Sequence, residues 1–149
     1  MQLRKMFAAD YDAVFELWTG CPEMELNDVD DSREGVERFL TRNPDTCFVA
    51  EEDGAILGVL LAGCDGRRGY IYHAAVVPEC RGRGVGSAMV EAALSALKTM
   101  GVSKVGLLTF CDNEGGNRFW KEHGFDARTD LLYHSNVLAD VHRIGIIRE

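Results

Sequence analysis

The clearest hydrophobic pattern runs from Tyr70 to Met100 and predicts a strand, a turn and a helix. Residues 70–77 are mostly β-branched, aromatic or small apolar, and Pro78 ends the strand because proline has no N–H for a ladder. After a glycine-rich turn, apolar residues recur at steps of three and four, the spacing of one helix face. They are Val85, Ala88, Met89, Ala92, Ala93, Ala96, Leu97 and Met100. Gly101 follows, where a helix end favours a left-handed residue.

Two amphipathic helices are expected before this unit. Asp10 is a candidate N-cap for the first. Its apolar positions at helical spacing are Tyr11, Val14, Phe15 and Trp18. The run Asp31-Ser32-Arg33-Glu34 resembles a capping box and predicts a second helix. The buried face of that helix would comprise Val36, Phe39 and Leu40, and Asn43-Pro44 would end it.

The remaining segments read as strands and one further helix. Gln2 to Phe7, Thr46 to Glu51 and Ala55 to Cys64 are predicted strands, the last two joined by the hairpin signal Glu52-Asp53-Gly54. Downstream we expect a strand at 104–110, a helix at 115–123 and one or two strands within 126–138. Together these elements predict an α/β fold in one domain spanning 1–149, with a mixed central sheet and helices on both faces.

The end of the chain is more apolar than a free tail. Within Asp140 to Glu149 the apolar residues are Val141, Ile144, Ile146 and Ile147. This segment is expected to form either an extra strand or a contact with a second subunit, which leaves a homodimer open.

The turn between strand and helix carries the candidate chemistry. Gly82, Gly84 and Gly86 let the backbone approach a ligand closely, and the turn delivers N–H groups to a helix N-terminus, which favours phosphate. Arg81 and Arg83 add positive charge. The turn has neither the lysine of a Walker loop nor the spacing of a dinucleotide fingerprint. We therefore interpret it as a pyrophosphate cradle, the alternative being a tight turn with two solvated arginines.

Two motifs resemble the signatures of the GNAT N-acetyltransferase superfamily. The first is Val76-Val77-Pro78 followed by Arg81, Gly84 and Gly86 in the pattern Arg-x-x-Gly-x-Gly. The second is Asn113, Gly116, Phe119-Trp120 and then Gly124-Phe125. Their order and separation are those of the family, and the resemblance covers roughly residues 1–138.

The resemblance implies acetyl-coenzyme A as co-substrate and a GNAT-like sheet whose strands splay beside the cradle. A backbone N–H at the level of Val76 and Val77 would face the thioester carbonyl. The cofactor-binding residues it implies are Val76, Val77, Arg81, Gly82, Arg83, Gly84, Val85, Gly86, Ser87, Asn113, Gly116, Phe119 and Trp120. The family transfers the acetyl group by direct attack, without a covalent enzyme intermediate.

The catalytic acid and base are less well defined by the sequence. Tyr72 and His73 lie upstream on the central strand, where the family often has a base, although a packed strand histidine is the favoured interpretation of His73. The family's proton donor is a tyrosine, and this chain has Trp120 in that position, whose indole N–H is not a useful acid. Either another group protonates the sulfur, with Tyr133 and Cys111 as the candidates, or the thiolate leaves without help.

Charge and composition narrow the class of partner. With 16 Lys and Arg against 24 Asp and Glu, the chain carries a net charge of −8, which argues against nucleic-acid binding and suits a cationic amine. The acidic run from Glu23 to Asp31 could contact such an acceptor or form a solvated loop.

The apolar run from Ala55 to Gly63 is far shorter than the roughly 20 residues that span a membrane. The histidines show no metal-ligand spacing, and five cysteines without a Cys-x-x-Cys pair indicate a reduced, cytoplasmic protein.

These observations predict an N-acetyltransferase that moves an acetyl group from acetyl-coenzyme A to a primary amine. The alternative is a regulatory module that binds acetyl-coenzyme A without turnover. This alternative rests on Trp120, which occupies the position of the family's proton-donating tyrosine.

Overall fold

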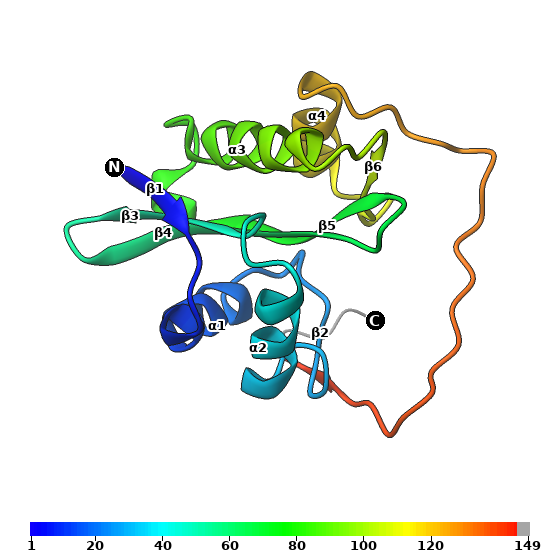
Figure 1. The fold of residues 1–149 in the computed structure, drawn as a ribbon, viewed down its shortest axis with the longest axis horizontal. Helices are drawn as coiled ribbons and strands as arrows, with labels where there is room; N and C mark the ends of the chain where they lie inside the picture. The colour runs from blue at the N-terminus through cyan, green and yellow to red at the C-terminus, as the bar shows by residue number, and fades with distance from the viewer. Residues whose placement is uncertain (146–149) are drawn as a thin grey trace.

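A computed structural model describes residues 1–145 and shows a five-stranded mixed sheet in the order β1-β3-β4-β5-β6 (Figure 1). The strands are β1 (Gln2–Lys5), β3 (Phe48–Glu52), β4 (Ala55–Cys64), β5 (Gly69–Val76) and β6 (Val105–Gly106). All neighbours are antiparallel except β5 and β6. The helices are α1 (Tyr11–Thr19), α2 (Arg33–Arg42), α3 (Val85–Thr99) and α4 (Glu114–Glu122), with short 3₁₀ turns at Ala8–Asp10 and Pro78–Cys80. The predicted fold class is confirmed.

Helices cover both faces of the sheet, and each face has its own core (Figure 1). Helices α1 and α2 pack on one face around Trp18 and Val59, whereas α3 packs on the other around Met89 and Leu60. Residues 57–63 of β4 are all buried because helices lie on both sides of this strand. Within residues 1–145 no helix is long and apolar enough to cross a membrane.

The hairpin and helix signals of the sequence are largely confirmed. Asp53 and Gly54 both have positive φ in the β3–β4 turn, as a two-residue hairpin requires. The N-cap of α2 is Ser32, whose hydroxyl accepts from the N–H of Gly35 at 3.1 Å. Asp10 precedes α1, but its side chain does not cap the helix because it binds the Arg4 guanidinium through both oxygens.

Strand β5 is interrupted by a bulge at His73. Val59 pairs with Ala75 and Leu61 with Tyr72, so the single residue Leu60 lies opposite His73 and Ala74. His73 has a φ of 49°, which is uncommon for a non-glycine residue. The bulge breaks the alternation of side chains and brings Tyr72 and His73 to the same side of the sheet as α1 and α2.

Strands β5 and β6 diverge almost at once. Their only paired residues are Gly69 with Val105 and Tyr70 with Gly106, although β5 continues to Val76. Among residues 1–145 the downstream part of β5 therefore has a strand neighbour on the β4 side alone, which is the splay that the family resemblance implies.

Two expectations for the C-terminal part have different outcomes. The strands predicted within 126–138 are absent, and that segment is extended and exposed because it lies against no sheet edge. The extra strand predicted after residue 140 is present as β7 (Arg143–Ile144), which pairs with β2 (Leu26–Asn27) in a separate two-stranded sheet. Ile146 and Ile147, which that prediction also used, lie outside the described residues.

Candidate functional site

A cavity of about 720 Å³ lies beside β5, between the start of α3, the start of α4 and the loop after α1. Its lining includes eleven of the thirteen cofactor-binding residues expected from the sequence: Val76, Arg81, Gly82, Gly84, Val85, Gly86, Ser87, Asn113, Gly116, Phe119 and Trp120. Val77 and Arg83 are not part of this lining. The volume lies within the range of about 300–1,000 Å³ usual for small-molecule sites.

The N-terminus of α3 opens into this cavity without any cap. The first intrahelical bond runs from Ala88 N to Gly84 O at 3.0 Å, so the N–H groups of Val85, Gly86 and Ser87 have no helical acceptor. No side chain of the described residues caps this end, and no acidic residue lies in the first turn. Free N–H groups at the positive end of a helix dipole favour an anion such as phosphate.

Two glycines of the turn are required for different physical reasons. Gly84 has a φ of 82°, a conformation that side chains disfavour. Gly86 lies under the Phe119 ring, and a Cβ there would approach two ring carbons to 3.2 Å. This contact sets α4 against the start of α3, so the two signature motifs of the sequence meet in one wall of the cavity.

The two arginines of the turn have different environments. Arg81 lines the cavity, and its Nε donates to the carbonyl of Val76 at 3.3 Å. Arg83 instead donates to Glu52 at 2.8 Å on the β3–β4 side. This pairing lowers the pKa of Glu52 and raises that of Arg83. Only Arg81 is placed to face a ligand in the cavity.

At the cavity wall, adjacent backbone N–H groups at the end of β5 point to opposite edges of the strand. The N–H of Val77 donates to the carbonyl of Leu57 at 2.8 Å, so it belongs to the β4 side. Successive N–H groups of a strand point to opposite edges, which directs the N–H of Val76 toward the splay. Of the two residues expected to face a thioester carbonyl, Val76 is therefore the one with its N–H on the open edge.

Trp120 packs as part of the cavity wall. Its ring lies edge-on to Phe119 and Phe125, with centroid distances of 5.1 and 5.2 Å. The described lining contains no tyrosine, so the phenol that the family uses has no counterpart in this wall.

Asp31 and His73 form a pair behind β5, away from the cavity lining. The His73 Nε2 lies 2.8 Å from Asp31 Oδ1, and Asp31, only 3% exposed, also accepts from the N–H of Asn27 at 2.8 Å. The buried Trp18 donates its indole N–H to the carbonyl of His73 at 3.0 Å and meets the imidazole edge-on. These contacts hold the bulge in place. They agree with the interpretation of His73 as a packed strand histidine, which the sequence offers as the alternative to a catalytic base.

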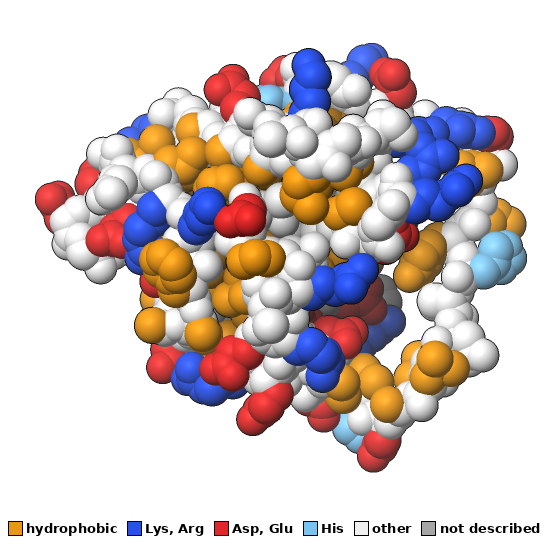
Figure 2. All heavy atoms as spheres, viewed as in Figure 1, with side chains coloured by type: hydrophobic (Ala, Val, Ile, Leu, Met, Phe, Trp, Pro, Cys, Tyr) orange, Lys and Arg blue, Asp and Glu red, His pale blue; other side chains and the backbone are white. Residues whose placement is uncertain are grey.

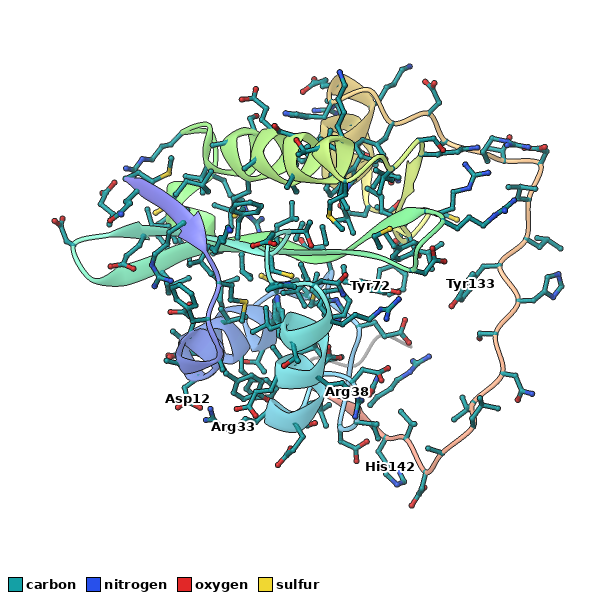
Figure 3. The ribbon with its side chains drawn as sticks, in the orientation of Figure 1. Asp12, Arg33, Arg38, Tyr72, Tyr133 and His142 are labelled. Atoms are coloured by element: carbon teal, nitrogen blue, oxygen red, sulfur yellow. The ribbon has the colours of Figure 1, made fainter. Side chains whose placement is uncertain are left out.

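Tyr72 and Tyr133 also lie outside the cavity lining. The Tyr72 ring packs edge-on against Phe39 and tilts against Tyr70, and burial raises its pKa. Tyr133 belongs to the exposed segment after α4 and points from it toward the Tyr72 side of the protein (Figure 3). The structure thus brings the expected cofactor residues together but places none of the three catalytic candidates with them.

The loop after α1 contributes residues that sequence reasoning did not assign to the site. Cys21, Glu23 and Met24 also line the cavity. Burial raises the pKa of the Cys21 thiol, and the nearby Arg81 guanidinium opposes that rise. Of the five acids in the run from Glu23 to Asp31, only Glu23 belongs to the lining.

The other acids of that run have structural partners. Glu25 pairs with Arg143, and Asp28 accepts from the backbone N–H of His142 at 2.8 Å. Asp30 accepts from the Asn27 side chain at 3.0 Å. The run is therefore not a continuous acidic surface, although Glu25, Asp28 and Asp30 remain exposed.

Comparisons with known proteins agree with this geometry. The model of the acetyltransferase (GNAT) family matches residues 11–125. An acetyltransferase of Photorhabdus laumondii is 36% identical over 114 residues, which are 76% of this chain and 78% of that protein.

Solved structures share the fold at low sequence identity. The PaiA N-acetyltransferase of Thermoplasma acidophilum, in complex with coenzyme A, has a TM-score of 0.74 at 16% identity, covering 85% of this chain and 90% of that one. The aminoglycoside 6'-N-acetyltransferase AAC(6')-IG of Acinetobacter haemolyticus has a TM-score of 0.72 at 17% identity, covering 93% and 100%. The cradle, the two signature motifs and the matches in sequence agree, and the chain belongs to the acetyltransferase (GNAT) family.

Proposed function

We propose that this protein moves an acetyl group from acetyl-coenzyme A to a primary amine by direct attack of the amine on the thioester. Acetyl transfer is the chemistry of its family, and acetyl-coenzyme A is the co-substrate that the family uses. The observation that carries the finer proposal is a single cavity lined both by an uncapped helix N-terminus and by the carboxylate of Glu23.

The cradle suits the donor. The free N–H groups at the start of α3 and the guanidinium of Arg81 would hold the pyrophosphate. The open edge of β5 offers backbone groups to the pantetheine arm, and the Val76 N–H would stabilise the oxyanion that forms on the thioester carbonyl. In this arrangement Trp120 and Phe119 supply apolar walls rather than chemistry.

The loop after α1 suits a cationic acceptor. Glu23 is the only acidic residue in the described lining, so it would bind the ammonium form and accept a proton as the amine becomes nucleophilic. The amine nitrogen then bonds to the carbonyl carbon and releases its second proton to solvent, the C–S bond breaks, and the sulfur leaves as a thiolate. Thiols have a pKa of about 8.5, so a thiolate can leave without the tyrosine that this cavity lacks.

The named solved relatives support an amine acceptor. They include an aminoglycoside 6'-N-acetyltransferase and the N-acetyltransferase PaiA. The runner-up, a sensing module without turnover, rests on Trp120 in the place of the family's acid.

Release of free thiol from acetyl-coenzyme A, followed across a panel of primary amines, tests the proposal. Glu23→Gln should raise the KM for the amine at least tenfold and leave the Kd for acetyl-coenzyme A unchanged. Glu25→Gln is the matched control, because Glu25 is two residues away and pairs with Arg143 outside the cavity. Binding of acetyl-coenzyme A without thiol release for any amine would favour the sensing module instead.

A further inference from the structure

The loop after α1 forms a tight turn that contributes three residues to the cavity wall. The N–H of Cys21 donates to the carbonyl of Trp18 at 3.0 Å, and the N–H of Met24 donates to the carbonyl of Cys21 at 3.1 Å. Pro22 is the second residue of this four-residue turn, where its fixed φ favours the turn conformation. The turn therefore continues directly from α1 and places Cys21, Glu23 and Met24 at the cavity.

Two of these three residues are apolar and almost fully buried. Cys21 is 3% exposed and Met24 is 9% exposed. Both belong to the core on the α1 side of the sheet, as does Ala75, which lines the same cavity. Thiol and thioether sulfurs are polarisable and form only weak hydrogen bonds. The side chains of this part of the wall therefore offer apolar contact, and Glu23 alone offers a strong hydrogen-bond acceptor.

Charge in the described lining is limited to one carboxylate, that of Glu23, and one guanidinium, that of Arg81. Since Arg81 would hold the pyrophosphate of the donor, Glu23 remains for the acceptor and can bind one ammonium group. A second ammonium on the same molecule would either stay in solvent or lie against sulfur and methyl groups, where an unpaired charge is costly. It would therefore add nothing to binding.

The other acids of the run from Glu23 to Asp31 do not extend this negative charge into the cavity, because none of them belongs to the lining. Figure 2 shows that, around α1 and α2, Asp and Glu side chains are interspersed with Lys and Arg. The net charge of −8 is therefore not gathered into a continuous acidic surface on this face. A polycation would gain little here beyond its contact with Glu23.

We propose that the acceptor is a monoamine on an apolar body, and not a polyamine or an amino sugar. This inference rests on the proposed transfer of an acetyl group to a primary amine. The ammonium group binds Glu23, and the apolar body packs against Cys21, Met24 and Ala75. An amino sugar would bring hydroxyl groups to a wall of sulfur and methyl groups that leaves them without partners. An alkylamine or an arylalkylamine has the chemistry that this wall suits.

Pentylamine and putrescine form a matched pair of probes for the first test. Their chains are equally long, and putrescine has a second ammonium in place of the terminal methyl group of pentylamine. With thiol release from acetyl-coenzyme A as the assay, kcat/KM for pentylamine should exceed that for putrescine by about tenfold or more. Lengthening the chain from propylamine to pentylamine should raise kcat/KM about fourfold for each methylene group that the wall buries.

Met24→Ala tests the apolar wall itself. It should reduce the preference for pentylamine over propylamine by about fourfold or more, because the longer chain loses the side chain on which it packs. Met6→Ala is the matched control, since Met6 is a methionine of the same core cluster, 3% exposed, that lies outside the described lining. If loosening of this core were the cause, both variants would lose the preference.

Calorimetry separates this inference from the proposed reaction. Amine binding is measured on the protein saturated with coenzyme A, which has no acetyl group to transfer, so the affinities do not depend on turnover. Absence of thiol release with every amine would refute the reaction, whereas tighter binding of pentylamine than of putrescine would still support the assignment of the ligand class. Equal or tighter binding of putrescine, no binding of pentylamine, or equal selectivity in Met24→Ala and Met6→Ala would overturn that assignment.

Discussion

Exchanging Gly84 for alanine tests whether the anion site lies at the start of α3. Gly84 is the N-cap of this helix with a φ of 82°, and a Cβ there would meet nothing within 4 Å. Gly101, just past the other end of the same helix, has a φ of 85° and equally open surroundings. Gly101→Ala is therefore a control matched in backbone conformation and in space, differing only in its distance from the cavity.

Both variants should lose similar amounts of folding stability. A left-handed conformation costs an L-residue roughly 1–2 kcal/mol. Loss of unfolded-state entropy on replacing glycine offsets about 0.4–1 kcal/mol of this. The net destabilisation is then about 1 kcal/mol, or roughly 2–4 °C in Tm for a chain of this size.

Only Gly84→Ala should weaken donor binding. The added methyl group occupies space beside the free N–H groups of α3, and a hydrogen bond to a charged group is worth about 1.5–3 kcal/mol. Loss of one such bond raises the Kd about 10–100-fold, since 1.4 kcal/mol corresponds to about tenfold. Calorimetry with acetyl-coenzyme A measures this Kd. Equal affinities in the two folded variants would refute the assignment of the pyrophosphate to this helix end.

Three further predictions follow from side-chain contacts. Trp120→Ala should weaken acetyl-coenzyme A binding whereas Trp120→Phe should not, because the ring packs in the cavity wall; a large gain in kcat for Trp120→Tyr at unchanged affinity would contradict this packing role. Asp31→Ala should leave two hydrogen-bond donors, the His73 imidazole and the Asn27 N–H, without their acceptor. Each such loss should lower the free energy of unfolding, measured in urea, by roughly 1–3 kcal/mol. The Arg4 guanidinium lowers the pKa of Asp10, so the pair stabilises the fold above the ordinary aspartate pKa of about 3.9, and this stability is lost as pH falls through the lowered value. Asp10→Asn should therefore reduce unfolding free energy at pH 7 and have little effect in strong acid; an equal loss at both pH values would exclude this pair as the cause.

Elements governed by local pattern were predictable from the sequence. The helix face of α3 and the hairpin at Asp53-Gly54 depend on residues a few positions apart, so periodicity and turn chemistry specify them. The cradle was predictable for the same reason, because strand, proline, glycines and helix follow one another directly in the chain.

Features that depend on distant partners were not predictable. Asp31 resembles part of a helix cap in the local sequence, but its carboxylate binds His73, 42 positions away, and Ser32 is the cap. Which acid of the run from Glu23 to Asp31 faces the cavity depends on how the loop after α1 lies against α3. The strand propensity of 126–138 is likewise local, whereas a strand needs a sheet edge within reach.

The role of Ser87 illustrates how one hydrogen bond changes an expectation drawn from sequence. Its hydroxyl lies 2.8 Å from Nε2 of His123, whose Nδ1 lies 2.7 Å from the carbonyl of Phe119. A carbonyl only accepts, so Nδ1 carries the hydrogen, and in the neutral imidazole Nε2 must accept from Ser87. The Ser87 hydroxyl therefore donates to His123 and presents lone pairs, not a hydrogen, to the cavity.

A phosphate in the cradle would gain little from that hydroxyl, while the backbone N–H of Ser87 remains available. We therefore expect Ser87→Ala to change the Kd for acetyl-coenzyme A by less than about threefold at pH 8, under ~1 kcal/mol at the usual conversion. Ser87→Pro, which removes the N–H at the third position of α3, should weaken binding far more if the helix stays folded. Circular dichroism checks the helix and calorimetry measures both affinities. A loss of more than tenfold for Ser87→Ala would mean that the hydroxyl leaves His123 to bind the ligand.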